Sequence, residues 1–296
     1  MTPMFTVVVP ATTANLGPGY DTIGLALDLQ MEVSVYEATT WSIRYEQEEY
    51  RALDGAEENL IIQTALNVAK AKEVQLPPLA LVVSSNIPLG KGLGSSASAI
   101  AAGIEVANEV ASLHLSLQEK LEWGSRLEGH ADNVNAAIAG GLVLSYYKED
   151  ELDVVRMPAP TVGALVLVPD VQLATSESRG VLPNTLDHAE ATAGSAAGTL
   201  FVGAIAQQNW ELAGKMLERD TFHEPYRKGM FPHFDDVREL VKEHGAYGMT
   251  ISGAGPSLFV IAPVDRTESI AEAVRSTYDM YHPIITHPSN QGAIIQ

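Results

Sequence analysis

Hydrophobic and polar residues alternate from Leu25 to Tyr36, and this alternation predicts a half-buried β-strand. The odd-numbered residues from Leu27 to Val35 are apolar, whereas the even-numbered residues from Asp28 to Ser34 are polar. Side chains of a strand point to opposite faces in turn. One face of this strand is therefore expected to pack on a core, and the other to meet solvent.

Shorter apolar runs predict further strands. They cover Phe5 to Val9, Trp41 to Tyr45, Leu79 to Ser85, Leu142 to Tyr146 and Gly163 to Pro169. The segments Tyr247 to Ser252 and Pro256 to Ile261 flank a glycine-rich turn, which predicts a hairpin.

Helices are predicted between these strands, where apolar or small residues recur. They cover Asn59 to Lys72, Ser98 to Leu113, Leu117 to Leu127, Asp187 to Gln208 and Phe234 to His244. Charged residues from Lys148 to Asp153 indicate a surface turn or a joint between domains. The pattern supports a mixed α+β fold and shows no obvious repeat.

The segment from Pro88 to Ala99, PLGKGLGSSASA, joins a predicted strand to an alanine-rich helix. Gly90, Gly92 and Gly94 permit positive φ and close backbone approach, so that N–H groups there can point at an anion. The positive end of the following helix would face the same loop. This junction is therefore able to hold phosphate.

Neither common phosphate-binding signature fits this junction. Lys91 lies between two glycines, whereas Walker A needs Lys before Ser or Thr, and Ser95 takes the place of the last glycine in G-x-G-x-x-G. Ser95 or Ser96 is expected to cap the helix. A glycine turn without a ligand stays open as the alternative.

The composition and net charge limit the classes of partner and ligand that the protein is expected to bind. The 296 residues are 46% apolar, which suits one large α+β unit or two closely packed domains. A net charge of −19 with 18 Lys and Arg argues against nucleic acid or an anionic membrane as partner. A nucleotide would then need Mg²⁺, backbone amides and a few cationic side chains to form a local positive pocket.

Cysteine is absent, which excludes disulfides, thiolate chemistry and cysteine-ligated metals. The first basic residue is Arg44, so the chain starts without the positive region of a secretory signal. No apolar run approaches the length of a membrane span. We expect a soluble, cytoplasmic protein.

Several segments resemble the GHMP kinases, in the form found in homoserine-specific members. The phosphate loop matches from Pro88 to Ala97, and PATTANLGPGYDTIG at Pro10 to Gly24 is similar to the first motif of the family. The other matches are EGHADNVNAAIAGG at Glu128 to Gly141, Thr175 to Pro183, DTFHEPYR at Asp220 to Arg227, and GMTISGAGPS at Gly248 to Ser257. Matching segments in the right order are far more specific than any one of them.

The resemblance implies a fold and an activity. The N-terminal half, residues 1–150, would be an ATP-binding domain like ribosomal protein S5, and residues 151–296 a ferredoxin-like domain. The implied reaction transfers the γ-phosphoryl group of ATP to the side-chain hydroxyl of L-homoserine, a step toward threonine. Two alternatives remain: another small-molecule kinase of the family, such as a mevalonate kinase, or a non-catalytic nucleotide-binding protein on the same scaffold. A homodimer also stays open.

The resemblance also implies an ATP site. Its residues would be Asn59 near the adenine and the loop residues Pro88, Leu89, Gly90, Lys91, Gly92, Leu93, Gly94, Ser95, Ser96, Ala97 and Ser98. Ser96 and Glu122 would hold Mg²⁺, Glu122 because it lies eleven residues before Asn133. Without the resemblance, Glu122 is an ordinary exposed helix residue and Ser96 a cap.

An amino-acid substrate brings an ammonium and a carboxylate, and a site that buries both must pair both. The resemblance implies that Asn15 and Asp21 bind the ammonium or the hydroxyl. It implies that Arg179 and Arg227 bind the carboxylate, because a guanidinium group can donate to two oxygens at once. His130 is a further candidate substrate ligand.

The expected catalytic residues are Asn133, Asp21 and Arg179. Many GHMP kinases carry Asp at the position of Asn133, and an amide cannot take a proton at neutral pH, but homoserine-specific members also have Asn. A second departure is Asn135-Ala136, where the family usually has Ala-Pro. Because of this change, the sequence leaves open which conformation the backbone takes on the substrate side of this segment.

Overall fold

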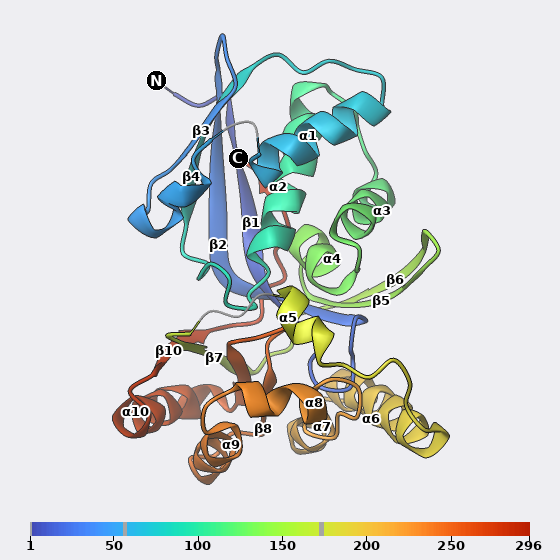
Figure 1. Ribbon diagram of the computed structural model, residues 1–296, viewed down its shortest axis with the longest axis vertical. Helices are drawn as coiled ribbons and strands as arrows, with labels where there is room; N and C mark the ends of the chain where they lie inside the picture. Colours follow the sequence, from blue (N-terminus) through green and yellow to red (C-terminus); the bar gives the residue numbers. More distant parts are fainter. Residues whose placement is uncertain (1, 56–57, 172–174) are drawn as a thin grey trace.

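The computed structural model describes residues 2–55, 58–171 and 175–296, and of Thr175 and Ser176 it describes the backbone alone. Two sheets, each accompanied by helices, lie one above the other along the long axis of the molecule (Figure 1). The arrangement confirms the predicted mixed α+β fold.

The first sheet has seven strands within the described residues. They are β1 (Phe5–Ala14), β2 (Ile23–Glu37), β3 (Ser42–Tyr45), β4 (Leu79–Ser85), β5 (Leu142–Lys148), β6 (Glu151–Met157) and β11 (Ile294–Ile295). Their order is β11-β1-β2-β4-β3, and β5 pairs with the first residues of β2 and with β6. Only β3 and β4 pair in parallel here.

Strand β2 confirms the predicted alternation. The odd-numbered residues from Leu27 to Val35 are buried, and Asp28 and Glu32 are exposed. Helices α1 (Leu60–Ala71), α2 (Ser95–Val110), α3 (Leu117–Glu128) and α4 (Asp132–Ala139) lie on the apolar side of this sheet (Figure 1). The main core forms between these two layers.

The predicted cap of helix α2 is wrong. The helix begins at Ser95, three residues before the predicted start, and its N-cap is Gly94 at φ 72°. A left-handed residue turns the chain sharply into the helix, which glycine does without strain. Asn59 caps helix α1, with its side chain accepting a hydrogen bond from the N–H of Ile61.

The second sheet is antiparallel throughout, in the order β10-β7-β9-β8. Its strands are β7 (Gly163–Pro169), β8 (Gly248–Ile251), β9 (Leu258–Ala262) and β10 (Tyr281–Thr286). The helices of this half are α5 (Thr175–Gly180), α6 (His188–Ala206), α7 (Trp210–Leu217), α8 (Glu224–Arg227), α9 (Phe234–Glu243) and α10 (Thr267–Thr277). The predicted hairpin is β8–β9, and the β-α-β-β-α-β succession confirms the ferredoxin-like expectation.

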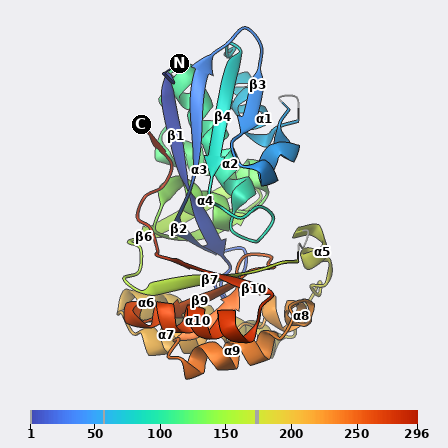
Figure 2. The same ribbon diagram turned by 90° about the vertical axis from the view of Figure 1, so that its left-hand side faces the viewer.

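Figure 2 shows the second sheet between the first half and the layer of helices that includes α6, α9 and α10. One face of the second sheet is therefore turned toward the first half. The loop between β1 and β2 meets the β8–β9 turn at this level, where Asn15 donates a hydrogen bond to Gly253 O.

In the charged segment from Lys148 to Asp153, Glu149 and Asp150 form an exposed hairpin turn, and the other residues belong to strands. Glu149 and Asp150 have φ values of 52° and 66°, and strand β6 follows and pairs with β5. The predicted division of the chain after residue 150 stays a prediction. Strand β6, which follows this point, pairs with β5 and so belongs to the sheet of the first half.

The chain returns to the first half at its end. Strand β11 pairs with β1, and Gln296 exchanges two backbone hydrogen bonds with Thr6. Earlier in this segment, the N–H of Ser289 bonds to Ala26 O and that of Ala293 to Ile138 O. Residues 287–296 thus complete the first half. None of the helices in the described ranges has the length and apolar character to cross a membrane.

Candidate active site

A cavity of about 240 Å³ opens where the two halves meet. It is lined by the glycine loop, the loop between β1 and β2, the start of α4, helices α5 and α8, and the β8–β9 turn. Its residues are Asn15, Tyr20, Asp21, Leu89 to Ser96, Glu128, His130, Asp132, Asn133, Arg179, Arg227 and Gly253 to Gly255.

The glycine loop depends on its glycines. Gly90, Gly92 and Gly94 have φ values of 67°, 74° and 72°. A Cβ on Gly92 would lie 2.4 Å from Ser252 O, and one on Gly94 would lie 2.0 Å from Thr12 Oγ1. A side chain fits at neither position, so the loop can pack against the β8–β9 turn and still turn its backbone toward the cavity.

Some loop residues predicted at the ATP site make contacts within the protein. Ser98 is buried and donates its hydroxyl hydrogen bond to Pro10 O at 2.9 Å, and Ala97 is buried in the core. Ser95 Oγ lies 3.3 Å from Pro88 O, which closes the loop on itself. The backbone N–H groups and Ser96 are the parts of this segment best placed for an anion.

Lys91 points its ammonium across to the second half. Its Nζ donates to the carbonyl oxygens of Pro169, Asp170 and Val171 at 2.7, 3.1 and 2.7 Å. These bonds use the three hydrogens of the ammonium. Burial outweighs the charge of Asp170 and lowers the pKa of Lys91 from its ordinary value.

A second cavity of about 660 Å³ adjoins the first and shares Leu89, Ser95 and Ser96 with it. Tyr45 and Tyr50 are stacked beside it, with ring centres 5.9 Å apart. Asn59 also lines it, but the Asn59 amide is engaged by Tyr45 OH at 3.0 Å and by the cap of α1. Asn59 can therefore shape this cavity, and its polar atoms already have partners.

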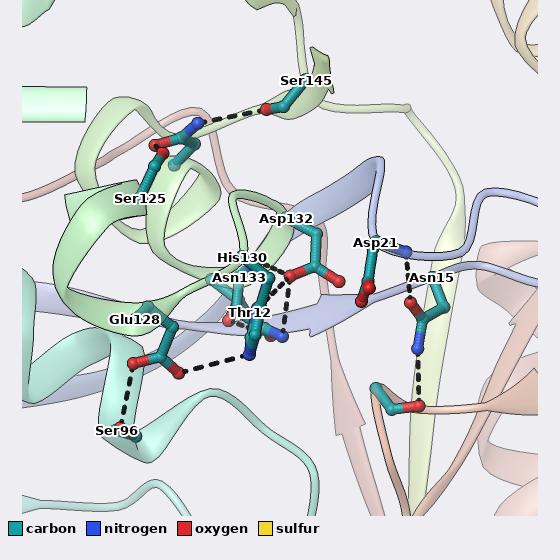
Figure 3. Close-up of polar contacts among 12 residues, drawn as sticks. Thr12, Asn15, Asp21, Ser96, Ser125, Glu128, His130, Asp132, Asn133 and Ser145 are labelled. Atoms are coloured by element: carbon teal, nitrogen blue, oxygen red, sulfur yellow. Dashed lines mark hydrogen bonds and ion pairs between the residues drawn. The ribbon is translucent and has the colours of Figure 1, made fainter. Parts of the chain in front are cut away.

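The predicted pairing of Ser96 with Glu122 is wrong. Glu122 does not line the cavity and accepts a hydrogen bond from Gln118 at 3.0 Å. The carboxylate beside Ser96 is Glu128, whose Oε2 accepts from Ser96 Oγ at 3.1 Å (Figure 3). Six residues of helix move a side chain about 9 Å along the axis and to another face, so the two glutamates cannot take each other's place.

Burial raises the pKa of Glu128, and the neighbouring His130 and the Ser96 hydroxyl offset this only in part. His130 Nε2 lies 3.9 Å from Glu128 Oε1, and His130 Nδ1 lies 2.8 Å from Asp132 Oδ1. Burial alone would lower the pKa of His130, but Asp132 and Glu128 together raise it above its ordinary value. The three side chains form one polar row along the cavity (Figure 3).

Asn133 lies at the start of α4, beside the glycine loop. Its Oδ1 accepts a hydrogen bond from Thr12 Oγ1 at 2.8 Å, which fixes the amide. Its Nδ2 donates to Asp132 Oδ1 at 3.5 Å, and the second hydrogen of this NH₂ group can serve another acceptor. A Cβ on Gly253 would lie 3.9 Å from that Nδ2. The buried carboxylate of Asp132 precedes it and accepts from the N–H of Asn133.

The loop between β1 and β2 supplies Asn15 and Asp21, both in left-handed conformation at φ 69° and 51°. Asn15 accepts from the N–H of Asp21 at 2.9 Å and donates to Gly253 O at 2.7 Å (Figure 3). Asp21 in turn forms a two-point ion pair with Arg179, at 2.8 and 3.1 Å. The strained turn is thus held from both halves of the molecule.

Arg227 carries the largest side chain among the fully buried residues, with 1% exposure. Its Nε donates to Ser178 O at 3.0 Å and its Nη1 to Gly253 O at 3.4 Å. In the described part of the chain, no carboxylate forms an ion pair with it, whereas Arg179 has Asp21. A buried cation beside a cavity without a counter-charge favours an anionic ligand.

The second departure from the family pattern lies away from the cavity. Asn135 is buried, donates to Ser145 Oγ at 3.1 Å, and accepts from Ser125 Oγ at 3.2 Å. It therefore joins α3, α4 and β5, and it is not among the residues that line the cavity.

Sequence reasoning missed Tyr20 and Glu128 as residues of the cavity. Both belong to segments that the resemblance identified, so their residue type and their position along the chain were known. What the sequence did not contain was the direction of each side chain.

Two family models match separate parts of the chain. The family model described as GHMP kinases N terminal domain matches residues 59–141, and the one described as GHMP kinases C terminal matches residues 201–279. A homoserine kinase from Halalkalibacterium halodurans is 39% identical over 293 residues, which are 99% of this chain and 95% of that protein. One from Bacillus cereus strain B4264 is 44% identical over 268 residues, 90% of this chain and 88% of that protein.

Solved structures are similar over the same extent. The crystal structure of homoserine kinase from Cytophaga hutchinsonii is 28% identical with a TM-score of 0.87, over 99% of this chain and 97% of that one. The mevalonate kinase from Methanococcus jannaschii is 14% identical with a TM-score of 0.74, over 97% and 98%. The second likeness shows a shared fold and nothing finer.

Proposed function

The chain belongs to the GHMP kinases, and among them to the homoserine kinases, and from this premise we propose that it phosphorylates the side-chain hydroxyl of L-homoserine with ATP. The products are O-phospho-L-homoserine and ADP. The observation that carries the substrate class is the buried Arg227, which lacks a carboxylate partner among the described residues and borders a cavity of small-molecule size.

The substrate carboxylate is taken by Arg227 and Arg179. A guanidinium offers two parallel donors to a carboxylate, and two such groups can share its oxygens. Asp21 already holds Arg179 in place with two hydrogen bonds. The ammonium of the substrate is placed near Asp21 and Asn15, which supply the negative charge and the amide oxygen on that side.

The nucleotide lies across both cavities. The phosphates follow the glycine loop and the N-terminus of α2, whose unpaired N–H groups and helix dipole favour anions. The base enters the cavity beside Tyr45 and Tyr50, in line with the placement of Asn59 there. Ser96 borders both cavities and so marks the junction of base and phosphates.

The residues present fit Mg²⁺ beside phosphate. Among the described residues, no group of three or more acidic, His or Cys side chains is arranged to hold a metal ion, so an all-protein cage is not available from them. Mg²⁺ beside phosphate needs only one or two protein oxygens, because phosphate and water supply the others. Glu128 and the hydroxyl of Ser96 would hold the ion, which would neutralise charge on the phosphates.

The chain's own contribution to the reaction is positioning and charge. The substrate hydroxyl oxygen bonds to the γ-phosphorus while the bond from that phosphorus to the β–γ bridging oxygen breaks. Asn133 Nδ2 and Arg179 orient the reacting groups, and neither takes a proton. The hydroxyl proton passes to an oxygen of the transferring phosphoryl group. A loose transition state has little bonding to the nucleophile, so the hydroxyl does not need to be deprotonated beforehand.

The proposed reaction is tested by measuring ADP release with homoserine, mevalonate, galactose and shikimate as acceptors. Homoserine alone is expected to support turnover above the rate of ATP hydrolysis in water. Equal or faster turnover with mevalonate would favour another member of the GHMP family, and no turnover with any acceptor would favour a nucleotide-binding protein without catalysis.

Replacing Asn133 by Ala is expected to lower kcat by about 10- to 100-fold and leave measurable activity, because positioning is lost and no proton acceptor is removed. Steady-state ADP release checks this. The reading of Asn133 is wrong if kcat of the parent enzyme shows an ionisation between about pH 4 and 6 that disappears in Asp21→Asn or Asp132→Asn while substrate still binds.

Replacing Lys91 by Met is expected to leave the KM for ATP within about threefold and to lower the free energy of unfolding by about 1 kcal/mol. The reason is that the ammonium binds three carbonyls of the second half. ATP kinetics and urea unfolding measure the two effects. A tenfold rise in the KM for ATP with unchanged stability would mean that Lys91 binds phosphate instead.

Three expectations from the sequence remain proposals. They are the cytoplasmic location, the absence of a nucleic-acid partner and the homodimer. The strongly acidic charge supports the second of them.

A further inference from the structure

Tyr20 lies between the two arginines of the proposed carboxylate site. The guanidinium carbon of Arg179 is 5.8 Å from the centre of the Tyr20 ring, and that of Arg227 is 5.5 Å from it. Arg179 Nη1 also donates to the Tyr20 hydroxyl oxygen at 3.1 Å, and Arg227 interacts with the same hydroxyl. One side chain therefore contacts both guanidinium groups.

Two arginines that share one carboxylate face a difficulty before that carboxylate arrives. Their positive charges repel each other across a partly buried site. Burial, and after it the charge of Arg179, lowers the pKa of Arg227. Asp21 compensates Arg179 directly, but among the described residues Arg227 has only the carbonyls of Ser178 and Gly253 as hydrogen-bond acceptors besides its contact with Tyr20.

The chemistry of a phenol suits this position. The face of the ring carries partial negative charge and attracts a guanidinium, and the hydroxyl oxygen accepts hydrogen bonds. The ring of His223 also lies against the Tyr20 ring, with ring centres 5.6 Å apart, and His223 is fully buried and does not line the cavity. Tyr20 is thus held in part by a side chain outside the cavity.

We propose that Tyr20 is a positioning residue that holds the guanidinium groups of Arg179 and Arg227 at the spacing in which both bind one carboxylate. It thereby sets the preference of the site for an amino acid over an amino alcohol. This inference rests on the proposed function, because it assigns a role toward the carboxylate of that substrate.

The experiment compares L-homoserine with 3-aminopropan-1-ol, which keeps the ammonium and hydroxyl but lacks the carboxylate. Values of kcat/KM are measured with both acceptors for the parent enzyme, Tyr20→Phe and Tyr20→Leu. Phe keeps the ring and removes the hydroxyl, so the preference for homoserine should fall about 5- to 10-fold. Leu removes both contacts, and the preference should fall about 10- to 50-fold.

Efficiency with 3-aminopropan-1-ol is expected to fall less than efficiency with L-homoserine in both variants, because this acceptor has no carboxylate for the arginines to bind and can lose only what Arg179 contributes to orienting the reacting groups. Binding of L-2-aminobutyrate, which has the carboxylate but no hydroxyl, should weaken by the same factors as the preference. This binding measurement does not depend on turnover of the poor acceptor. Tyr146, 58% exposed on β5, gives the matched control, and Tyr146→Phe should change neither quantity.

Several outcomes overturn the inference. Equal losses with both acceptors would show general structural support, and an unchanged preference in Tyr20→Phe and Tyr20→Leu would show that the arginines are positioned without Tyr20. If Tyr20→Leu does not fold, the measurements on Tyr20→Phe still distinguish these outcomes from the expected result. A parent enzyme with no preference for homoserine over 3-aminopropan-1-ol would instead refute the carboxylate site of the proposed function, and the inference with it.

Discussion

Turnover is expected to fall by about 10²-fold or more when Glu128 is replaced by Gln, the order found when one group that stabilises developing charge is removed. Glu128 is the carboxylate beside Ser96 and the glycine loop, and Gln keeps its size and hydrogen bonding without the charge. The loss should be largest in kcat and should remain at saturating Mg²⁺. Initial rates over a range of Mg²⁺ concentrations measure it.

Glu122→Gln is the matched control, since it makes the same chemical change on the same helix outside the cavity. It should retain activity close to that of the parent enzyme. Circular dichroism and thermal unfolding should place both variants near the parent. If Glu122→Gln were the impaired variant and Glu128→Gln were active, the assignment of the carboxylate beside the phosphates would have to be reversed.

Replacing Arg227 by Ala is expected to raise the KM for homoserine by about 10- to 150-fold, because each charge-assisted hydrogen bond to the carboxylate contributes about 1.5–3 kcal/mol. The KM for ATP should change little, since the proposed phosphate contacts are the glycine loop and the N-terminus of α2 and do not include this guanidinium. Arg179→Ala should act in the same direction. Steady-state kinetics with each substrate varied in turn provide the measurement.

Arg227 is buried, so its loss also leaves the carbonyls of Ser178 and Gly253 without this donor. Some loss of stability is therefore expected in Arg227→Ala. Arg227→Lys keeps the positive charge without the two parallel donors of the guanidinium, so it distinguishes the effect on stability from the effect on substrate binding. Arg275→Ala, at an exposed arginine on α10, is the control. A rise in the KM for ATP alone, or equal use of an acceptor without a carboxylate by the parent enzyme, would contradict the assignment.

The sequence was sufficient where local pattern decides the structure. The alternation in β2, the run from Leu79 to Ser85 and the glycine turn between β8 and β9 depend on side-chain period and turn chemistry. These signals are local, and the structure confirms them. Strand β6 was missed because it begins with charged residues of a tight hairpin, so that Glu151 and Asp153 read as part of a turn.

The site was harder to predict because it depends on directions in space. The resemblance brought together Asn15, Asp21, Arg179 and Arg227 from distant parts of the chain, and the structure places these four around one cavity. It assigned the wrong glutamate because spacing along the sequence does not say which face of α3 meets the glycine loop. It also left Tyr20 unmarked, since nothing local indicates that two arginines from other elements lie against its ring.

Strand β11 has a consequence for how the molecule is made. The edge of the first sheet beside β1 is completed by Ile294 and Ile295, which follow the whole second half in the chain. On a ribosome, the first half therefore stays with an unpaired edge on β1 while residues 158–286 are synthesised and begin to fold. Final closure waits for residues 287–296, so we expect nascent chains stopped before them to be cut by protease in the first half more readily than full-length chains.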